Sequence, residues 1–398
     1  MKTYDVLIVG GGLAGASLAL ALKPLGLSLA VVETLSPETR RASPAGDRAL
    51  ALALGSVEIF RKLSVWDKAA AKAVPIHHIH VSDRGHFGKT RLHATELGVE
   101  ALGYVIPARE LEQAVLETCA HRAVDFICPA EVTGLKVLEN RVEIRLKSDR
   151  ETWRCQARLV VAADGGNSKV RQWMGIGQRV QDYGQVALVS TVECEKPHRY
   201  TAYERFTSSG PLALLPLAKR RCALIWSQET QQARKLQSLP SPEMEARLQQ
   251  AFGWKLGALG LAAPLRAFPL RLIRAERLFG ERVVIVGNAA HQLHPVAGQG
   301  FNLGLRDVMV LAGFLEEQQR RGGDPGAFTL LERYAKARVR DHDRVIGFSD
   351  GLIRWFSLST SFSALGRNLG LLALDHLPPL KRRFSYQAMG MDQESGFL

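Results

Sequence analysis

The chain is poor in cysteine and lacks long apolar runs. Its five cysteines (Cys119, Cys128, Cys155, Cys194 and Cys222) are scattered and odd in number, and none has CxxC or metal-ligand spacing. A disulfide framework is therefore not expected, and a reduced, cytoplasmic protein is the simplest interpretation. No stretch reaches about 18 unbroken apolar residues, so no transmembrane helix is predicted.

Acidic residues are also in short supply, with 39 against 52 basic residues and a net charge of +13. This excess favours anionic partners, such as phosphate-bearing cofactors, nucleic acid or an anionic membrane surface. No basic run is interleaved with aromatic residues, so a nucleic-acid partner is not expected. The closely spaced His77, His78 and His80 have no nearby carboxylate or cysteine, which favours a strand with polar positions and predicts no metal site.

The N-terminus contains a pattern typical of dinucleotide binding. Residues 4–9 form an apolar run that predicts a buried parallel strand, and residues 10–15 read GGGLAG, which matches GxGxxG. A helix is expected over residues 14–25 and a second strand over residues 27–32. Glu33 ends that strand 18 residues after Gly15, where an acid that binds ribose belongs.

Two further stretches have the same strand, glycine turn and helix order. The first, residues 159–171, is an apolar run that ends in Asp164-Gly165, with Ser168 placed to start a helix. The second, residues 287–307, follows the apolar run 282–286 and leads into a helix predicted over residues 302–315. Such a turn directs backbone N–H groups at an electron-rich ligand. A purely structural turn role for Asp164 remains open.

Residues 294–307 resemble the signature of the ubiquinone-biosynthesis FAD-dependent hydroxylases, and residues 164–171 resemble the Asp-Gly motif of the flavin aromatic hydroxylases. With the N-terminal motif, the resemblance covers nearly the whole chain. It is closest to the 2-polyprenyl-6-methoxyphenol hydroxylase type, within the single-component flavoprotein aromatic monooxygenases. The resemblance implies that NADH or NADPH reduces FAD. Dioxygen then gives a flavin hydroperoxide, whose distal oxygen attacks the ring of a prenylated phenol.

The resemblance also implies a fold. We expect an α/β protein with a Rossmann-like FAD-binding domain, similar to para-hydroxybenzoate hydroxylase, made of residues 1–73, 104–176 and 274–345. Short strands broken by proline and glycine predict an inserted, mostly antiparallel substrate domain from residues 74–103 and 177–273. Residues 346–398 form a C-terminal helical region.

The candidate site residues follow from the motifs and from the resemblance. No catalytic residue is firm, but Pro295 and Gln299 are candidates next to the flavin. Leu214 and Pro216 are weak candidates for substrate contact. The predicted FAD-binding residues are Gly10, Gly12, Leu13, Ala14, Gly15, Glu33, Arg48, Arg109, Asp164, Gly287, Asn288, Pro295, Gly298, Gln299, Gly300, Phe301 and Asn302.

One of these residues departs from the family pattern. The broader aromatic-hydroxylase group usually has Gly-Asp where this chain has Gly287-Asn288, and the aspartate accepts a hydrogen bond from the ribityl chain. Asn288 can still accept through its amide oxygen, but without charge, so weaker FAD binding is expected. Asp307 is expected to hold the loop, and His291 and His294 are given structural roles. The charged residues Arg338, Arg340, Asp341 and Asp343 are expected to form a solvated, ion-paired face.

Alternatives remain open at this point. The substrate could be a small soluble aromatic acid, and the chain could be a flavin-poor scaffold of a ubiquinone-biosynthesis complex. A flavin-dependent halogenase is disfavoured because no two tryptophans have the WxWxIP spacing. The apolar and basic C-terminal segment could contact the inner face of a membrane, a partner protein, the core or a second copy in a homo-oligomer.

Overall fold

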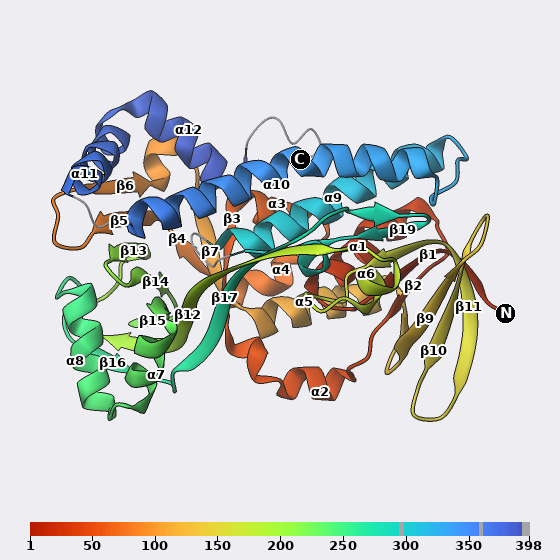
Figure 1. Cartoon of the computed structure of the whole chain (residues 1–398), viewed down its shortest axis with the longest axis horizontal. Helices are drawn as coiled ribbons and strands as arrows, with labels where there is room; N and C mark the ends of the chain where they lie inside the picture. Colours follow the sequence, from red (N-terminus) through yellow and green to blue (C-terminus); the bar gives the residue numbers. More distant parts are fainter. Residues whose placement is uncertain (294–297, 358–360, 392–398) are drawn as a thin grey trace.

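The computed structural model describes residues 1–293, 298–357 and 361–391. The first of its three sheets has eight strands in the order β18-β19-β11-β1-β2-β8, with β10 and β9 continuing from β11 (Figure 1). Strands β19, β11, β1, β2 and β8 are parallel. The bounds are β1 (Thr3–Val9), β2 (Leu29–Val32), β8 (Asp125–Ile127), β9 (Glu131–Val137), β10 (Val142–Lys147), β11 (Thr152–Ala162), β18 (Phe279–Gly280) and β19 (Val283–Ile285).

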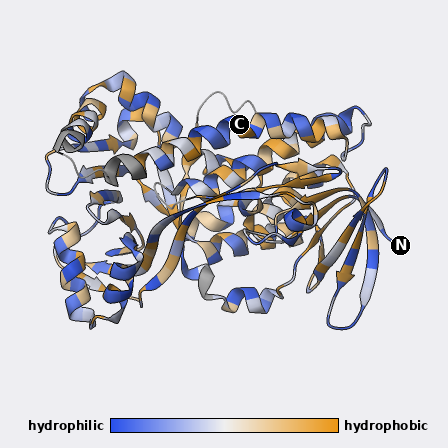
Figure 2. Cartoon of the chain, in the orientation of Figure 1, coloured by the Kyte–Doolittle hydropathy of each residue, from blue (hydrophilic) through white to orange (hydrophobic). Residues whose placement is uncertain are grey.

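This parallel sheet is apolar on both faces because helices cover both, as the hydropathy view shows (Figure 2). The helices that pack around it include α1 (Leu13–Leu22), α5 (Ala108–His121), α9 (Gln299–Arg320) and α10 (Phe328–Ser357). The predicted Rossmann-like arrangement is therefore confirmed. Helix α9 is longer than the predicted residues 302–315, because its polar C-terminal residues 316–320 extend the helix past the apolar pattern.

The second sheet has nine strands and is mostly antiparallel, as predicted. Only β13 and β5 pair in parallel among its described strands. One face packs on α7 (Thr230–Ser238), which the sequence did not predict, and on α8 (Ser241–Phe252). The strands are β5 (His78–Asp83), β6 (Lys89–His93), β12 (Gln178–Cys194), β13 (Thr201–Thr207), β14 (Gly210–Pro216), β15 (Arg221–Glu229), β16 (Leu259–Leu261), β17 (Arg266–Ala275) and β20 (His291–Gln292).

A third sheet of three short strands joins the two larger ones. Strands β3 (Ala49–Ala53) and β4 (Val74–Ile76) both pair with β7 (Gly103–Pro107). The remaining short helices are α2 (Pro37–Ala42), α3 (Leu54–Lys62), α4 (Trp66–Ala69) and α6 (Lys169–Trp173). Residues 74–76, which were expected in the substrate domain, pair as β4 with β7, a strand of the predicted FAD-binding domain. The proposed division into domains otherwise stays a prediction.

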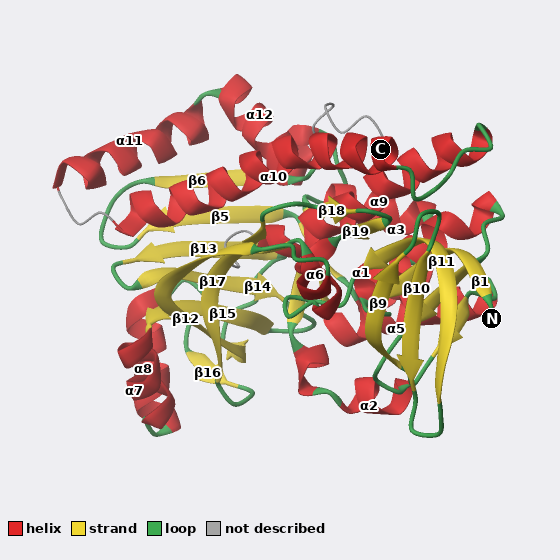
Figure 3. Cartoon of the chain, turned by 45° about the vertical axis from the view of Figure 1, so that its right-hand side comes forward, coloured by secondary structure: helices red, strands yellow, loops and turns green. Residues whose placement is uncertain are grey.

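The C-terminal region is helical, as predicted, with α11 (Ser361–His376) and α12 (Pro378–Ala388). Helix α10 lies against β14 and α11 lies against β6 (Figure 3). The side chain of Asp375 accepts a hydrogen bond from the Arg91 N–H at 2.7 Å, so α11 satisfies part of the open edge of β6. Met389 is buried, and its carbonyl oxygen accepts from the Gly55 N–H at 2.9 Å. The segment around Met389 is therefore packed against α3. Within the described residues, no helix is long and apolar enough to span a membrane.

Candidate functional site: an FAD-binding edge

The first glycine motif forms a tight turn between β1 and α1. Gly10 has a φ of +101°, which only glycine adopts readily. A Cβ on Gly15 would lie 1.9 Å from the Gly10 carbonyl oxygen, so glycine is needed for α1 to pack on the turn. A Cβ on Gly12 would meet nothing within 4 Å. The helix has no side-chain cap and no acid in its first turn, so its free N–H groups face open space suited to an anion.

Glu33 lies beside this turn at the end of β2, as predicted. Its Oε2 accepts from the Gly11 N–H at 2.7 Å and its Oε1 from the Leu35 N–H at 2.9 Å. Arg40, which the sequence did not single out, has its guanidinium 3.8 Å from Glu33 Oε2. These contacts fix the carboxylate at the position expected for a ribose-binding acid, a role that stays a prediction.

Asp164 follows β11 and adjoins the same turn, since a Cβ on Gly10 would lie 2.4 Å from the Ala163 carbonyl oxygen. Asp164 Oδ1 is buried without a hydrogen-bond partner, while Oδ2 accepts from the Val170 N–H at 3.3 Å. Burial raises the pKa of this carboxyl, and hydrogen bonds from Ser168 and Val170 oppose the rise. An unpartnered buried oxygen at this position fits a ligand that donates a hydrogen bond.

The glycine turn at residue 287 lies against the first turn of α1. Gly287 has a φ of +59°, and a Cβ there would lie 3.2 Å from the Ala14 Cβ in the first turn of α1. Leu13 begins that helix. The Asn288 side chain is exposed and makes no hydrogen bond with the described part of the chain. The glycine turn at residue 287 and the GxGxxG turn, both predicted to bind FAD, are therefore in contact.

Helix α9 begins at Gln299, three residues earlier than predicted. Its N-cap, Gly298, has a φ of +63°, and a Cβ there would lie 2.9 Å from the Ala51 Cβ. A Cβ on Gly300 would instead make an ordinary contact of 3.6 Å with the Leu293 Cβ. Gln299 is buried, and Phe301 stacks on Phe60 with ring centroids 6.3 Å apart. Pro295 and His294 lie outside the described residues.

Asn302 is held by four hydrogen bonds within the protein. Its Nδ2 donates to the carbonyl oxygens of Ala51 at 3.0 Å and Gly298 at 2.8 Å. Its Oδ1 accepts from the Ala53 N–H at 3.0 Å and the Ser56 hydroxyl at 2.7 Å. Because these bonds use the whole amide, we interpret Asn302 as the residue that fastens the start of α9 to β3, and not as a side-chain ligand of the flavin ring.

Arg48 and Arg109 come together at one end of the β3–β7 pair. The Arg48 carbonyl oxygen accepts from the Ala108 N–H at 2.9 Å. Arg109 Nη2 donates to Asp47 Oδ1 at 2.7 Å and to the Ser43 carbonyl oxygen at 3.2 Å. The Arg48 side chain is exposed. Arg48 directly precedes β3, and the helix that follows this strand begins at Leu54.

The predicted substrate contacts at Leu214 and Pro216 are not supported. Leu214 is fully buried in the core between the nine-stranded sheet and helices α7 and α8. Pro216, two residues on, lies on the same face by strand alternation. The neighbouring Leu215 and Leu217 face the opposite side, where they pack toward β3, β4 and β7. Both faces of β14 are thus covered, which agrees with its sequence, GPLALLP, in which polar and apolar residues do not alternate.

The expected solvated charge face is wrong for two of its four members. Arg338 is 2% exposed, and its Nε donates to Asp307 Oδ1 at 2.7 Å. Its Nη2 donates to Asp341 Oδ2 at 2.7 Å. These residues turn inward because α10 packs on α9, whose Asp307 needs a partner. Arg340 and Asp343 are exposed, as expected.

Asp307 is the centre of this buried network. The rings of His291 and His342 contact its two oxygens through their Nε2 atoms at 2.9 Å and 2.8 Å. Burial alone would raise the pKa of Asp307, but His342, Arg338 and His291 hold it well below its usual range. The side chains of His291, Asp307 and His342 lie close enough together to bind a cation. The guanidinium of Arg338, however, already pairs with Asp307. We interpret the network as the support of the loop before α9, the role predicted for Asp307.

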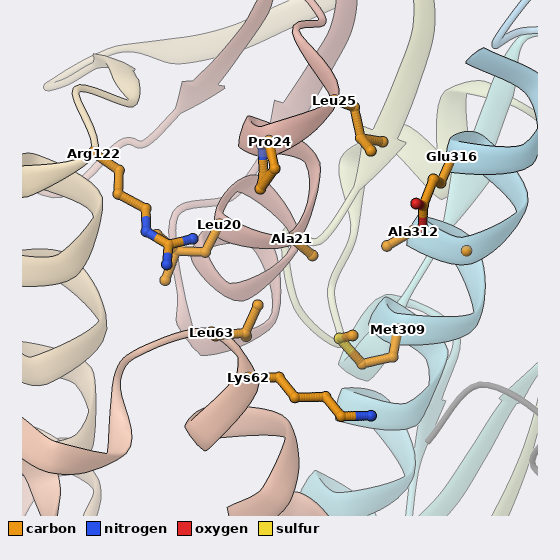
Figure 4. Close-up of a pocket in the computed structure, with 11 residues that line it drawn as sticks. Leu20, Ala21, Pro24, Leu25, Lys62, Leu63, Arg122, Met309, Ala312 and Glu316 are labelled. Atoms are coloured by element: carbon orange, nitrogen blue, oxygen red, sulfur yellow. The ribbon is translucent and has the colours of Figure 1, made fainter. Parts of the chain in front are cut away.

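A pocket of about 220 Å³ lies elsewhere, at the C-terminal ends of α1 and α3 (Figure 4). It contains none of the predicted site residues and is smaller than the roughly 300–1,000 Å³ usual for ligand sites. Its lining is Leu20, Ala21, Pro24, Leu25, Lys62, Leu63, Arg122, Met309, Ala312, Gly313 and Glu316.

The features that fit FAD all lie at the carboxyl edge of the parallel sheet, because β1, β2, β11 and β19 run in the same direction. They are the two uncapped helix N-termini of α1 and α9, the open space at Gly12 and the unpartnered oxygen of Asp164. Dinucleotides bind at this edge in open α/β sheets. Arg171 connects the parts, because its Nη1 donates to the Ala289 carbonyl oxygen at 2.8 Å.

Comparisons with known proteins agree with this geometry. The sequence profile of the FAD binding domain family matches residues 3–349. A ubiquinone hydroxylase of Rhodospirillum rubrum is 40% identical over 391 residues, which are 98% of this chain and 90% of that protein. The 3-demethoxyubiquinol 3-hydroxylase of Escherichia coli is 32% identical over 97% of this chain and 98% of its own length.

The solved structures show the same fold. The p-nitrophenol 4-monooxygenase of Pseudomonas putida matches with a TM-score of 0.81 and 17% identity, over 98% of this chain and 99% of that one. A probable FAD-dependent monooxygenase of Pseudomonas aeruginosa matches with a TM-score of 0.78 and 22% identity, over 93% of this chain and all of that one. The chain thus belongs to the FAD binding domain family and, within it, to the FAD-dependent aromatic monooxygenases that act as hydroxylases in ubiquinone biosynthesis.

Proposed function

We propose that the protein hydroxylates a polyprenylated phenol, using FAD, NADH or NADPH, and dioxygen. The observation that carries this choice of substrate is an apolar cluster between the nine-stranded sheet and the three-stranded sheet. Leu215 and Leu217 of the sheet, Leu54 at the start of α3 and Met389 near the C-terminus all belong to it or pack against it. A substrate site bordered by this apolar cluster favours a phenol with a hydrocarbon chain over a small anion.

In this proposal the chain holds FAD along the carboxyl edge of the parallel sheet. The free N–H groups of α1 bind the pyrophosphate, Glu33 binds a ribose, and Asp164 and Asn288 accept hydrogen bonds from the rest of the cofactor. The start of α9, from Gly298 to Gly300, contacts the flavin ring through its backbone. Bound FAD supplies the reduction and oxygen chemistry, and the protein binds and orients the ring and excludes water.

Two other functions predict different behaviour. A hydroxylase of a soluble aromatic acid needs a cation beside the substrate, whereas the cluster proposed to border the substrate consists of apolar side chains. A flavin-poor scaffold is favoured only by Asn288, whose uncharged amide replaces the acid usual in this group. We therefore rank both below the hydroxylase of a prenylated phenol.

The test uses purified full-length protein with added FAD. Dioxygen uptake and NAD(P)H oxidation are measured with a short-chain prenylated phenol and with a matched hydroxybenzoate, and the products are identified by mass spectrometry. We expect a hydroxylated prenylphenol. Conversion of the hydroxybenzoate alone would favour the soluble-acid function, and protein that stays colourless with added FAD would favour the scaffold. The quinone precursor that accumulates in a deletion strain then names the step.

We also propose that the C-terminal region makes a peripheral contact with an anionic membrane. Leu369, Leu377 and Leu380 are 55%, 52% and 47% exposed, and α12 carries Arg382 and Arg383. Apolar side chains beside cations are typical of interfacial helices. The paired Leu377→Ser and Leu380→Ser substitution should release the protein from anionic vesicles in a sedimentation assay. Unchanged vesicle binding, or a lower oligomeric state of the variant, would instead favour a partner protein or a homo-oligomer.

A further inference from the structure

Glu204 lies in the middle of β13, between β5 and β14 of the nine-stranded sheet. Its register partners are Val81 on β5 and Ala213 on β14. Side chains alternate along a strand, so Glu204 shares its face with Ala202 and with Leu215 on the neighbouring strand. Both of these belong to or pack against the apolar cluster that faces β3, β4 and β7. An acid is thus placed on the apolar side of the sheet.

The other face of the same strand is different. Tyr203 packs in the core under α8, and its ring lies 5.8 Å from that of His80. The nearby Lys255 contacts His80, with Nζ 3.3 Å from Nδ1. His80 and Lys255 therefore lie on the α8 side of the sheet, away from Glu204.

Glu204 has no hydrogen bond or ion pair with any part of the chain that the structure describes. Its side chain is only half-buried, yet the surrounding protein is dense enough that burial raises its pKa to about 7. No nearby charge contributes to this shift. The group is therefore recessed in apolar surroundings, still reachable by a small molecule, and left without a partner. Acids of this kind cluster at functional sites.

The remaining charged groups near this face already have partners. Asp83 lies two residues along β5 from Val81 and pairs with Arg367 of α11 at 3.2 Å and with His86 at 3.2 Å. Asp350 of α10 accepts from the Tyr183 hydroxyl at 3.0 Å. Glu204 is thus the carboxyl on this face that remains available among the described residues.

The apolar cluster connects Glu204 to the flavin edge. It includes Ala202 and Leu215 beside Glu204, and also Ala49 of β3 and Leu54 of α3. Ala51 lies between Ala49 and Leu54 in the sequence. A Cβ on Gly298, at the start of α9, would lie 2.9 Å from the Ala51 Cβ. The strand that carries Glu204 and the strand next to the start of α9 therefore pack on the same apolar cluster.

We propose that Glu204 is the catalytic base that accepts the hydroxyl proton of the substrate phenol. This inference rests on the proposed hydroxylase function. The phenol O–H bond breaks and its proton passes to a carboxylate oxygen of Glu204, while the electron pair stays on the phenol oxygen and enriches the ring carbons ortho and para to it. One such carbon takes one oxygen atom of dioxygen, and loss of its proton to water restores the aromatic ring. The other oxygen atom leaves as water, with two electrons supplied by NAD(P)H.

The proposed role explains why Glu204 has no cationic partner among the described residues. A carboxylate paired with a cation would be a weaker base, and a pKa close to neutral suits proton transfer under physiological conditions. A carboxylate beside this apolar cluster also repels an aromatic acid, which agrees with a neutral phenol as substrate.

The test compares Glu204→Gln with wild type in the FAD-loaded, full-length protein. Glutamine keeps the shape and can accept a hydrogen bond but no proton. General base catalysis is commonly worth about 10²–10⁴-fold, so we expect kcat for product formation to fall by about 100-fold or more with little change in KM. The kcat of the wild type should rise with pH through about neutral pH and then level off. The kcat of the Glu204→Gln variant should not show this rise. Glu204→Asp should restore part of the rate.

Glu193→Gln is the matched control, because Glu193 is an exposed carboxylate of the same sheet on β12. It should keep wild-type rate and pH profile. A Glu204→Gln rate within about three-fold of wild type, with the same pH profile, would overturn the assignment. If wild-type protein binds FAD but hydroxylates no phenol, the proposed function fails before the role of Glu204 is reached, so the two failures are distinguishable.

A stability measurement separates catalysis from folding. The folded-state pKa of Glu204 is raised, so ionising this carboxyl costs stability as pH rises from its unfolded value toward about 7. Glu204→Gln should therefore match the wild-type Tm at acidic pH and exceed it at pH above 7, with full FAD content. A lower Tm at pH 8 would show a structural partner for this carboxylate and would contradict the proposal.

Discussion

Arg171 Nη1 donates a hydrogen bond to the Ala289 carbonyl oxygen at 2.8 Å, which joins the Asp-Gly motif to the glycine turn before α9. Its Nη2 donates to the Gly166 carbonyl oxygen at 3.0 Å. Arg171 is 3% exposed, and burial lowers its pKa while Asp164 opposes this effect. One buried side chain thus fixes the spacing of two motifs that lie more than a hundred residues apart in the sequence.

Replacing Arg171 by methionine should weaken both folding and FAD binding. The two carbonyl oxygens would lose a charged donor, at a cost of roughly 2–3 kcal/mol in unfolding free energy. FAD content and chemical denaturation measure the two effects. The exposed Arg150→Met is the control and should change neither. An Arg171→Met protein with wild-type FAD affinity would show that the spacing of the motifs is set by other contacts.

Two glycines near the predicted ring site should respond differently to alanine. Gly298→Ala forces a positive φ and a contact with Ala51, and we expect a loss of roughly 1–2 kcal/mol in stability together with weaker FAD binding. Gly300→Ala makes only an ordinary contact with Leu293 inside a helix, so stability should be kept or slightly increased. Loss of FAD from a stable Gly300 variant, followed by flavin absorbance, would place the ring against this residue. Wild-type affinity even in Gly300→Val would contradict that placement.

Asn288→Asp should tighten FAD binding. The exposed side chain can accept from the ribityl chain, and a charged acceptor adds about 1 kcal/mol over a neutral one, which corresponds to roughly five-fold in Kd. Isothermal titration of apoprotein with FAD measures the change. Weaker binding by the aspartate variant would indicate that Asn288 donates, rather than accepts, in the complex.

Asp307→Asn should be strongly destabilising, because it removes one of the two carboxylates that pair with the buried Arg338 and leaves only Asp341 as its charged partner among the described residues. Removing one member of a buried pair commonly costs about 3–5 kcal/mol. The folded pKa of Asp307 is lowered, so its contribution is present above the unfolded value of about 3.9 and is lost as pH falls below it. The Tm difference between wild type and variant should therefore narrow in acid. Asp343→Asn, at an exposed pair with Arg274, should cost less than about 1 kcal/mol.

Truncation after residue 350 should give an insoluble or associated protein. It removes Asp375 and the other α11 contacts from the edge of β6 and removes Met389 from the apolar cluster. An exposed strand edge pairs readily with other chains. Leu380→Ser, at an exposed side chain of α12, should remain soluble. A soluble, folded truncation that no longer binds vesicles would instead show that the C-terminal helices are only an anchor.

The local patterns of the sequence predicted the elements that carry the cofactor motifs. Continuous apolar runs before residues 10, 164 and 287 predicted buried parallel strands, and the glycines after them predicted turns. The sequence pattern gave a wrong prediction where contacts between helices bury charged residues. Arg338 and Asp341 have the charged spacing of a solvated helix, yet packing of α10 on α9 turns them inward toward Asp307 and Arg306.

The sequence by itself determined the Rossmann-like sheet, the three glycine turns and the membership of the flavin hydroxylases, because each depends on residues close together in the chain. Only the tertiary structure decided which face of β14 packs under α7 and α8, that Met389 is buried, and that Glu204 has no partner among the described residues on an apolar face of the sheet. These depend on which strands become neighbours, and a strand covered on both faces has no polar side to reveal its orientation.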